Sequence, residues 1–229
     1  MISKNLLKVS DLSRTVKPKL SRMSFTVTEG EVLALVGPNG VGKTSLLKCL
    51  LGILDCNGKI EVEGIEISTI SRKELAKKIA YVPQIPENEC QLKVEQYLDL
   101  SFFASSRISL DRKNDAIRLL KLEKLLIESF DTLSGGERQR VLIACAFCQN
   151  PKIYLLDEPF AALDIANTKE VMEIIKLLKT SGSAVLIALH DLNLVSFCAD
   201  RVLQVVSGEL LATEHYVNAF SDNSYPQAL

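Results

Sequence analysis

The feature that most limits how this chain of 229 residues can fold is a glycine-rich loop at residues 37–44, which reads GPNGVGKT. It fits the pattern G-x-x-x-x-G-K-[ST], follows an apolar run at residues 31–36 and precedes helical spacing at residues 44–54. In a strand–loop–helix unit, glycines let backbone N–H groups converge on an anion, and the helix N-terminus adds positive potential. The loop therefore predicts a phosphate site at the edge of an α/β sheet.

The side chains of this loop predict a nucleoside triphosphate as the ligand. We expect Lys43 to reach the β- and γ-phosphates and Thr44 to offer its hydroxyl to Mg²⁺. The predicted nucleotide-binding set is Gly37, Pro38, Asn39, Gly40, Val41, Gly42, Lys43, Thr44 and Ser45.

A second polar site follows an apolar strand. Residues 153–158 read IYLLDE, so the strand ends in Asp157 and Glu158. Ligands sit at the carboxyl ends of strands in open α/β sheets. We expect Asp157 to hold Mg²⁺ and Glu158 to orient or deprotonate an attacking water.

The remaining text predicts one compact unit with a helical insertion. Between residues 89 and 150 the spacing is helical and β-branched runs are scarce, whereas strands and helices alternate after Pro151. That alternation indicates a parallel sheet covered on both faces. Strands are predicted at 6–9, 23–28, 31–36, 59–62, 79–82, 153–156, 185–189 and 202–206, and helices at 44–54, 72–78, 94–103, 111–122, 137–149 and 165–179.

Composition excludes several classes of protein. The 27 basic and 28 acidic residues balance, which argues against a nucleic-acid-binding protein. No apolar stretch reaches the ~18–20 residues that cross a bilayer, and no secretory signal is evident, so we expect free thiols in a reducing compartment. Cys145 and Cys148 form a C-x-x-C pair, which we interpret as buried helix positions rather than a metal or redox site.

Residues 133–140 read LSGGERQR, and with the two sites above they make the chain resemble the nucleotide-binding subunits of ABC transporters over about residues 6–211. The resemblance implies a single ABC nucleotide-binding domain at 1–229, an α/β P-loop NTPase of RecA-like core. It further implies an N-terminal antiparallel β subdomain, a core subdomain at 1–88 and 150–229, and a helical subdomain at 89–149.

The same resemblance implies further site residues. The second loop closes over ATP held by another subunit, through Ser134, Gly135, Gly136 and Glu137. Gln84 contacts Mg²⁺ and the attacking water, Asp164 lies in a loop between subunits, and His190 contacts the γ-phosphate. The alternative for His190 is a purely structural role.

One departure concerns the base of the nucleotide. The family usually stacks adenine on an aromatic residue upstream of the first strand pair, yet residues 1–24 contain none. Either Arg14 stacks through its guanidinium plane, or Val16 gives apolar cover, or residues 14–19 are a solvated basic loop.

Residues 71–84 and 188–194 are similar to importers of iron–siderophore complexes, haem and cobalamin. The implied function is ATP hydrolysis with Mg²⁺, powering such an importer from the cytoplasmic face of the cell membrane as a peripheral subunit. The implied partners are a second copy of the chain, integral-membrane permease subunits and, indirectly, an extracellular or periplasmic substrate-binding protein. The alternatives are a zinc or manganese importer, a soluble ABC ATPase such as an iron–sulfur assembly factor, and a binding-only subunit.

Overall fold

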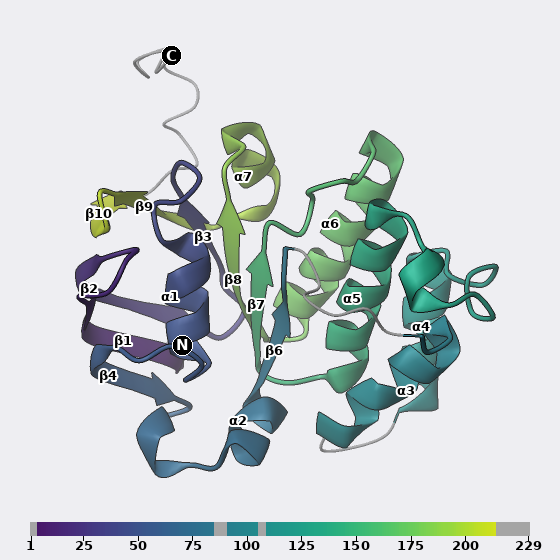
Figure 1. The fold of residues 1–229 in the computed structure, drawn as a ribbon, viewed down its shortest axis with the longest axis horizontal. Coiled ribbons are helices and arrows are strands. Elements are labelled where there is room, and N and C mark those ends of the chain that lie inside the picture. The colour runs from purple at the N-terminus through teal and green to yellow at the C-terminus, as the bar shows by residue number, and fades with distance from the viewer. Residues whose placement is uncertain (1–3, 85–90, 105–108, 214–229) are drawn as a thin grey trace.

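The computed structural model describes residues 4–84, 91–104 and 109–213, which form a ten-stranded sheet with helices on both sides (Figure 1). The strand order is β5-β4-β1-β2-β10-β9-β3-β8-β7-β6. The two halves of this order differ in strand direction, and the parallel half positions the site.

The parallel half confirms the α/β prediction. β3 (Val32–Val36) lies between β8 (Ala184–Leu189) and β9 (Arg201–Val206), and β7 (Ile153–Asp157) lies between β8 and β6 (Ile79–Val82). Every residue of β3, β7 and β8 is buried, as expected for strands covered on both faces.

The antiparallel half contains the N-terminal strands, as predicted. β1 (Asn5–Arg14) pairs with β2 (Leu20–Thr28) and β4 (Asn57–Val62), and β4 pairs with β5 (Ile65–Glu66). The sheet remains continuous because β10 (Glu209–Thr213) is antiparallel to β9 and also meets β2. The turn at Glu29 and Gly30 joins β2 to β3, but these strands do not pair with each other.

Helices cover the two faces unequally (Figure 1). α1 (Lys43–Leu50) lies between the N-terminal strands and the parallel strands, while α5 (Gly135–Gln149) and α6 (Ile165–Thr180) lie on the opposite face. The other helical segments are α2 (Arg72–Lys78), α3 (Val94–Ala104), α4 (Leu110–Leu119), α7 (Leu192–Cys198) and the short 3₁₀ turns η1 (Ile67–Thr69) and η2 (Phe130–Thr132).

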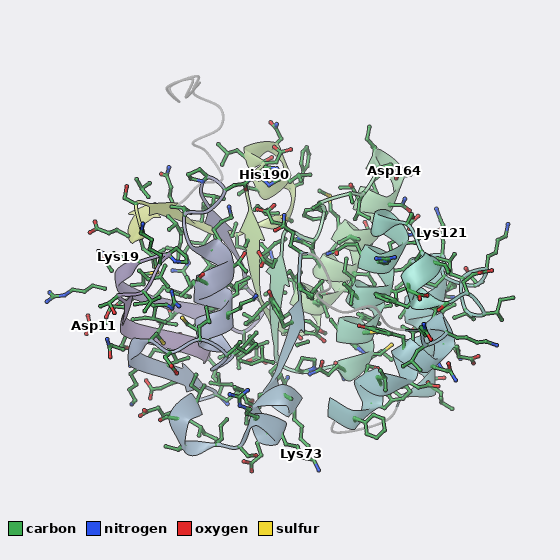
Figure 2. All side chains as sticks on the ribbon, viewed as in Figure 1. Asp11, Lys19, Lys73, Lys121, Asp164 and His190 are labelled. Atoms are coloured by element: carbon green, nitrogen blue, oxygen red, sulfur yellow. The ribbon has the colours of Figure 1, made fainter. Side chains whose placement is uncertain are left out.

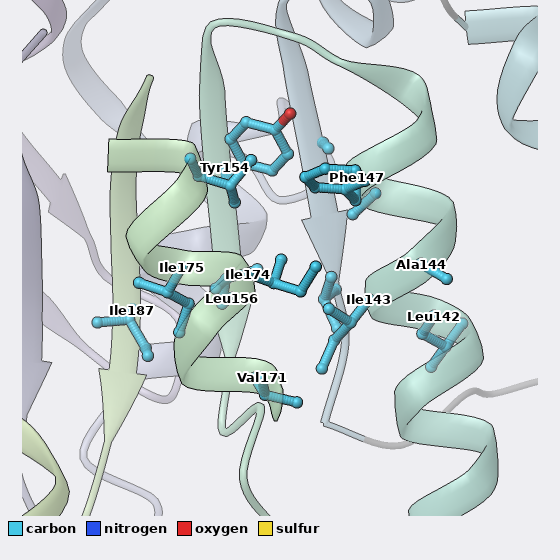
Figure 3. Close-up of a cluster of buried hydrophobic side chains, with 14 of the residues drawn as sticks. Leu142, Ile143, Ala144, Phe147, Tyr154, Leu156, Val171, Ile174, Ile175 and Ile187 are labelled. Atoms are coloured by element: carbon cyan, nitrogen blue, oxygen red, sulfur yellow. The ribbon is translucent and has the colours of Figure 1, made fainter. Parts of the chain in front are cut away.

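Alternation along the buried strands produces two hydrophobic cores. In β3, Leu33 and Leu35 join the core around α1, whereas Val32, Ala34 and Val36 join the core around α5 and α6. Figure 3 shows the second core, where residues of α5 and α6 meet side chains of β7 and β8. Full burial of one such side chain contributes about 1.5–3 kcal/mol, so both faces hold the central strands in place.

Polar contacts tie the helical segment to the central sheet. The Arg112 guanidinium of α4 lies 3.9 Å from the Phe147 ring centroid and donates through Nε to the Phe147 carbonyl at 2.6 Å. Its Nη2 lies 3.5 Å from the hydroxyl of Tyr154, a fully buried residue of β7. Burial raises the pKa of Tyr154 to about 12, so this phenol stays neutral.

Several predicted element bounds were wrong. α1 ends at Leu50 rather than residue 54, because Gly52 adopts a φ of 63° and its N–H bonds the Cys49 carbonyl. β1 continues five residues beyond the predicted end, with a register shift around Asp11 that broke the alternation. The sequence prediction omitted α7, β5 and β10, and the predicted boundary at 88/89 lies outside the described residues.

The cysteines behave as predicted wherever they are described. Cys49, Cys56, Cys145, Cys148 and Cys198 are free thiols. Burial raises the pKa of Cys148 to about 11, and the thiol of Cys145 donates to the Tyr97 carbonyl at 3.6 Å. Within the described part of the chain, none of the helices is both long enough and apolar enough to cross a membrane.

Candidate nucleotide site

Four neighbouring parallel strands bring the predicted residues to one edge of the sheet. The glycine-rich loop follows β3, His190 follows β8, Asp157 ends β7, and Gln84 follows β6 after one intervening residue. In Figure 2, His190 and Asp164 lie along the upper edge of the view, whereas Lys73 of α2 lies at the opposite end. The order of the strands therefore explains why residues distant in sequence share one site.

Lys43 opens α1 and is held by the loop that precedes it. Its Nζ donates to the Gly37 carbonyl at 2.6 Å and to the Pro38 carbonyl at 3.3 Å. It also lies 3.4 Å from Glu158 Oε1, with only 6% of the residue exposed. A phosphate group would compete with these oxygens for the ammonium, which is the contact predicted for Lys43.

Gly42 is required where the loop enters α1. Its φ is 115°, and a Cβ at this position would lie 2.7 Å from Leu20 Cδ2. A side chain would therefore strain the backbone and push the β1–β2 connection away from the helix N-terminus. The first strand pair and the phosphate loop are packed together at this point.

Glu158 contacts both Lys43 and His190. Its Oε1 faces Lys43, and its Oε2 lies 2.6 Å from His190 Nδ1. The residue is 5% exposed, adopts a φ of 49° and donates its N–H to the Ala188 carbonyl at 3.0 Å. The backbone of Glu158 is thus bonded to β8, which holds the carboxylate beside the lysine.

Asp157 is a buried carboxylate with an unused oxygen. Only 1% of the residue is exposed, and its Oδ1 accepts no hydrogen bond from the described residues. The Tyr81 hydroxyl donates to Oδ2 at 3.3 Å. Burial raises the pKa of the Asp157 carboxyl, and hydrogen bonds from the Thr44 and Tyr81 hydroxyls offset part of this effect.

Two hollows meet at this group of side chains. One, of about 340 Å³, is lined by the loop residues Asn39, Gly40, Gly42, Lys43, Thr44 and Ser45 together with Pro18, Gln84 and Glu158. The other, of about 430 Å³, is lined by Thr44, Lys48, Ile53, Tyr81, Pro83, Gln84 and Asp157. Thr44 and Gln84 border both hollows. The sequence analysis predicted that these two residues contact a phosphate-bound Mg²⁺.

The second predicted loop lies outside both hollows. Ser134 is exposed and caps α5, where it forms a reciprocal capping box with Glu137. Glu137 accepts from the Ser134 N–H at 2.9 Å and from its hydroxyl at 2.6 Å, and these bonds lower the pKa of the Glu137 carboxyl. The structure therefore gives Glu137 a local role in forming the helix N-terminus, and separates this loop from Lys43.

The loop after Glu158 packs directly against the Ser134 loop. A Cβ on Gly136 would lie 2.8 Å from the Ala162 carbonyl, and Ala162 has a φ of 65°. Asp164 caps α6 by accepting from the Asn167 N–H at 2.7 Å, and it is exposed. Neither Asp164 nor residues 134–137 line the two hollows, so a single chain does not bring all the predicted residues together.

Arg14 bonds to the connection between β1 and β2. Its Nη1 donates to three carbonyls in succession, at 2.5 Å to Val16, 3.0 Å to Lys17 and 3.4 Å to Pro18. The guanidinium therefore holds the backbone of the connection between β1 and β2. Val16 is 64% exposed, so apolar cover by Val16, stacking by Arg14 and a solvated loop all stay as predictions.

Sequence reasoning assigned no role to two residues of the site. Tyr81 supports Asp157, and the signal was its place near the end of β6, the neighbour of β7. Pro18 lines the phosphate hollow, which no spacing rule indicated, because its position depends on how the β1–β2 connection packs on Gly42.

Comparison with known proteins agrees with this geometry. A family profile described as ABC transporter matches residues 20–161. The chain is 37% identical over 216 residues to the vitamin B12 import ATP-binding protein BtuD of Vibrio cholerae, covering 90% of this chain and 85% of that protein. It is 33% identical over 201 residues to the petrobactin import ATP-binding protein FpuC of Bacillus anthracis, covering 84% and 74%.

A solved structure titled "Structure of ATP binding subunit of ABC transporter" superposes with a TM-score of 0.82 at 29% identity, covering 90% of this chain and 88% of that chain. This likeness confirms the P-loop NTPase fold expected from the sequence.

Proposed function

Because this chain belongs to the ABC transporter family and is an ATPase of that class, we propose that it powers an importer as one of two identical subunits. The observation that carries the proposal is the separation of the two phosphate-binding loops. Lys43 lies in a hollow beside Glu158, whereas Ser134 is exposed at the start of α5 and outside that hollow. A second copy with two-fold symmetry would supply its Ser134 loop to this Lys43 loop and receive the same in return.

In this proposal Glu158 is the catalytic base. Its carboxylate orients a water, whose oxygen attacks the γ-phosphorus while the bond to the ADP oxygen breaks and the water proton passes to Glu158. Lys43 neutralises charge on the transferred phosphoryl group. His190, bonded to Glu158 Oε2, positions that carboxylate and, in this proposal, also contacts the γ-phosphate.

The residues around Asp157 fit Mg²⁺. The free buried Oδ1 of Asp157 is a hard anionic oxygen, and the Thr44 hydroxyl and Gln84 amide oxygen border the same space. Among the described residues there is no cluster of three His, Cys, Asp or Glu side chains, so phosphate and water oxygens would complete the shell. When bound, the ion supplies positive charge to the phosphate oxygens.

The remaining site residues are proposed from the family pattern. Ser134, Gly135 and Gly136 would face phosphate through the α5 N-terminus, Glu137 would shape that turn, and Asp164 would lie at the contact between copies. We likewise propose the division into a core subdomain at 1–88 and 150–229 and a helical subdomain at 89–149.

For cargo, we propose a metal chelate such as a ferric siderophore, haem or cobalamin. The support is that relatives covering most of this chain are named for vitamin B12 and petrobactin import. The corresponding partners are integral-membrane permease subunits, and an extracellular or periplasmic binding protein acting through them. The chain would lie on the cytoplasmic face of the membrane.

The first test is purification of the tagged Glu158→Gln variant from detergent-solubilised cells. We expect recovery with an integral-membrane subunit and, after incubation with ATP, a trapped dimer that a Lys43→Ala control does not form. Recovery with soluble partners alone contradicts the transporter assignment and favours a soluble ABC ATPase. Full turnover by Glu158→Gln in the assembled complex would show that another group is the base.

The cargo is tested separately by uptake in cells that carry the Lys43→Ala chain. Loss of uptake of a labelled siderophore complex, haem or cobalamin supports the proposal. Loss confined to zinc or manganese favours that alternative importer.

A further inference from the structure

Lys121 joins the two helices whose exposed starts are proposed to face the second copy. Ser134 caps α5 and Asp164 caps α6, and these two helix starts pack against each other. Arg140 of α5 and Glu170 of α6 each lie six residues beyond the cap of their own helix. At a rise of about 1.5 Å per residue, each is about 9 Å along its helix from the cap. A contact between them therefore fixes both helix starts.

Lys121 follows α4 and contacts both helices. Arg140 Nη1 donates to the Leu120 carbonyl at 2.7 Å and to the Lys121 carbonyl at 3.4 Å. The Lys121 ammonium lies 2.5 Å from Glu170 Oε1. Lys121 adopts a φ of 50°, which is uncommon for a residue other than glycine, and in this conformation its carbonyl faces α5 while its ammonium faces α6. We call Arg140, Lys121 and Glu170 the α5–α6 link.

Glu170 is the buried end of the α5–α6 link. Its side chain is 12% exposed, whereas that of Lys121 is 68% exposed, and both of its carboxylate oxygens are buried. Neither oxygen accepts a hydrogen bond from the described residues, so the ion pair with Lys121 compensates the buried charge. An apolar pair of similar volume often stabilises such a place as well as an ion pair does. Stability alone therefore does not explain this pair.

The α5–α6 link is separate from the hollows around Lys43 and Asp157. None of its three residues is among those that line either hollow. In Figure 2, Lys121 and Asp164 both lie at the upper right of the view, on the side of the helical segment. A change in the link would therefore reach the reaction through the positions of the two helix starts, and not through the residues around Lys43.

We propose that the α5–α6 link sets the position of the Ser134 loop relative to Asp164, so that both fit the nucleotide site of the second copy at the same time. Lys121 and Glu170 are positioning residues in this role. The inference rests on the proposed two-fold dimer, and it names the residues that prepare the loop which one copy offers to the other.

Glu170→Gln keeps the size of the side chain and removes its charge. We expect kcat for ATP hydrolysis to fall at least about tenfold, since a misplacement of about 1 Å can cost about 100-fold. The dissociation constant of the single chain for ATP, measured by calorimetry, should stay unchanged because the hollow around Lys43 is intact. The matched control is Glu63→Gln, which breaks a lysine–glutamate ion pair of 2.6 Å with Lys78 and should change neither value. An unchanged kcat or a weakened affinity in Glu170→Gln overturns the inference.

Mixing variants shows which loop the link serves. In an equal mixture with Lys43→Ala, the Glu170→Gln chain combines its own Lys43 with a well-placed Ser134 of the other chain. This mixture should be more active than Glu170→Gln alone. With Ser134→Ala no such site forms, so that mixture should be less active than Glu170→Gln alone. The reverse pattern, or a loss of activity in both mixtures, overturns the inference.

The control for these mixtures is Lys43→Ala combined with Ser134→Ala. If this pair regains no activity, the proposed two-fold dimer itself is contradicted, whereas the α5–α6 link is tested only when the pair does regain activity. The two failures are therefore distinguishable.

Lys121 variants test whether Lys121 and Glu170 act as a pair. Lys121→Ala should lower kcat, and Lys121→Arg should keep most of the activity because a cation remains. Adding Lys121→Ala to Glu170→Gln should cause little further loss, because residues in contact are not additive. Arg118→Ala removes an exposed cation from the same segment as a control and should leave kcat unchanged. Additive losses, or an unchanged kcat in a Lys121→Ala chain, contradict the pairing.

Discussion

The two glycine-containing loops of this chain look alike in sequence, yet the structure treats them in opposite ways. Both place small residues at a helix N-terminus. In the first, Lys43 is buried and bonded to its own loop carbonyls and to Glu158. In the second, Ser134 is exposed, and its side chain bonds to Glu137 in a capping box.

The difference teaches how a site can be divided between molecules. At the first loop, cationic, acidic and hydroxyl groups converge on a hollow, and the proposed function assigns the reaction to them. The second has a positively polarised helix end and a hydroxyl, which suit a phosphate delivered from elsewhere. Neither half is sufficient for the proposed reaction.

The largest effect expected from this comparison is on turnover. Lys43→Ala and Ser134→Ala should each reduce ATP hydrolysis by at least about 100-fold, since each removes a group that stabilises the transferred phosphate. Their effects on a single chain should differ, because Lys43→Ala weakens nucleotide binding measured by calorimetry and Ser134→Ala does not.

Mixing these two variants gives a sharper result. An equal mixture forms heterodimers in which one site combines an intact Lys43 with an intact Ser134. Random pairing then restores roughly a quarter of wild-type activity in a two-fold dimer. A mixture no more active than either variant alone would show that the loops do not act across chains.

The second prediction concerns how stability depends on pH. Replacing Asp157, beside the first loop, and Glu137, in the second loop, should change the melting temperature in opposite directions. Burial raises the pKa of Asp157, so its charged form destabilises the fold, and Asp157→Asn should raise the melting temperature at pH 7 by about 2–4 °C for ~1 kcal/mol. The gain should disappear as the pH falls through the raised pKa and below the unfolded value near 4, where the wild-type carboxyl is protonated. Thermal melts between pH 3.5 and 8 measure it.

For Glu137 we expect the opposite change in melting temperature. Its pKa is lowered by the Ser134 hydroxyl and N–H, so the ionised carboxylate stabilises the fold above the unfolded pKa and this contribution is lost as pH falls through the lowered pKa. Glu137→Gln should lower the melting temperature at pH 7. The loss in unfolding free energy should be less than about 1 kcal/mol, because solvent screens this half-buried group. If both variants shifted the melting temperature at pH 7 in the same direction, the contrast between the two loops would be contradicted.

The smallest expected effect is on stability and concerns the contact between α4 and β7. Tyr154 is on β7, the strand that ends in Asp157, and its hydroxyl accepts from Arg112 of the helical segment. Tyr154→Phe leaves the shape of the core intact and removes this acceptor, which should cost about 0.5–1 kcal/mol in denaturant unfolding. We expect KM for ATP to stay unchanged, and a clear increase would mean that the contact also controls the nucleotide site.

Local sequence patterns were sufficient to predict that Lys43, Asp157 and Glu158 lie close together. The glycine spacing before Lys43 and the apolar run before Asp157 and Glu158 each describe a strand end, and parallel pairing brings such ends together. The helix start at Ser134 was also readable, because Glu137 follows at the capping-box spacing.

Contacts between segments distant in sequence could not be predicted from the sequence. The three carbonyls around Arg14 and the approach of Pro18 to Gly42 depend on how the β1–β2 connection packs, which no periodicity encodes. β10 escaped prediction because its position depends on pairing with β9 and β2. The end of α1 was misplaced because Gly52 ended the helix earlier than the apolar spacing suggested.

The position of β3 has a consequence for the order in which this protein assembles during synthesis. β3 carries the phosphate loop, yet both of its neighbours, β8 and β9, come from the last quarter of the chain. While the ribosome makes the intervening residues, residues 32–36 have no strand partners and their apolar side chains lack one of their two cores. Such long-range strand pairing is slow, and it leaves hydrophobic surface exposed to aggregation until it is complete. We therefore expect the phosphate loop to be among the last parts of the molecule to acquire its final shape.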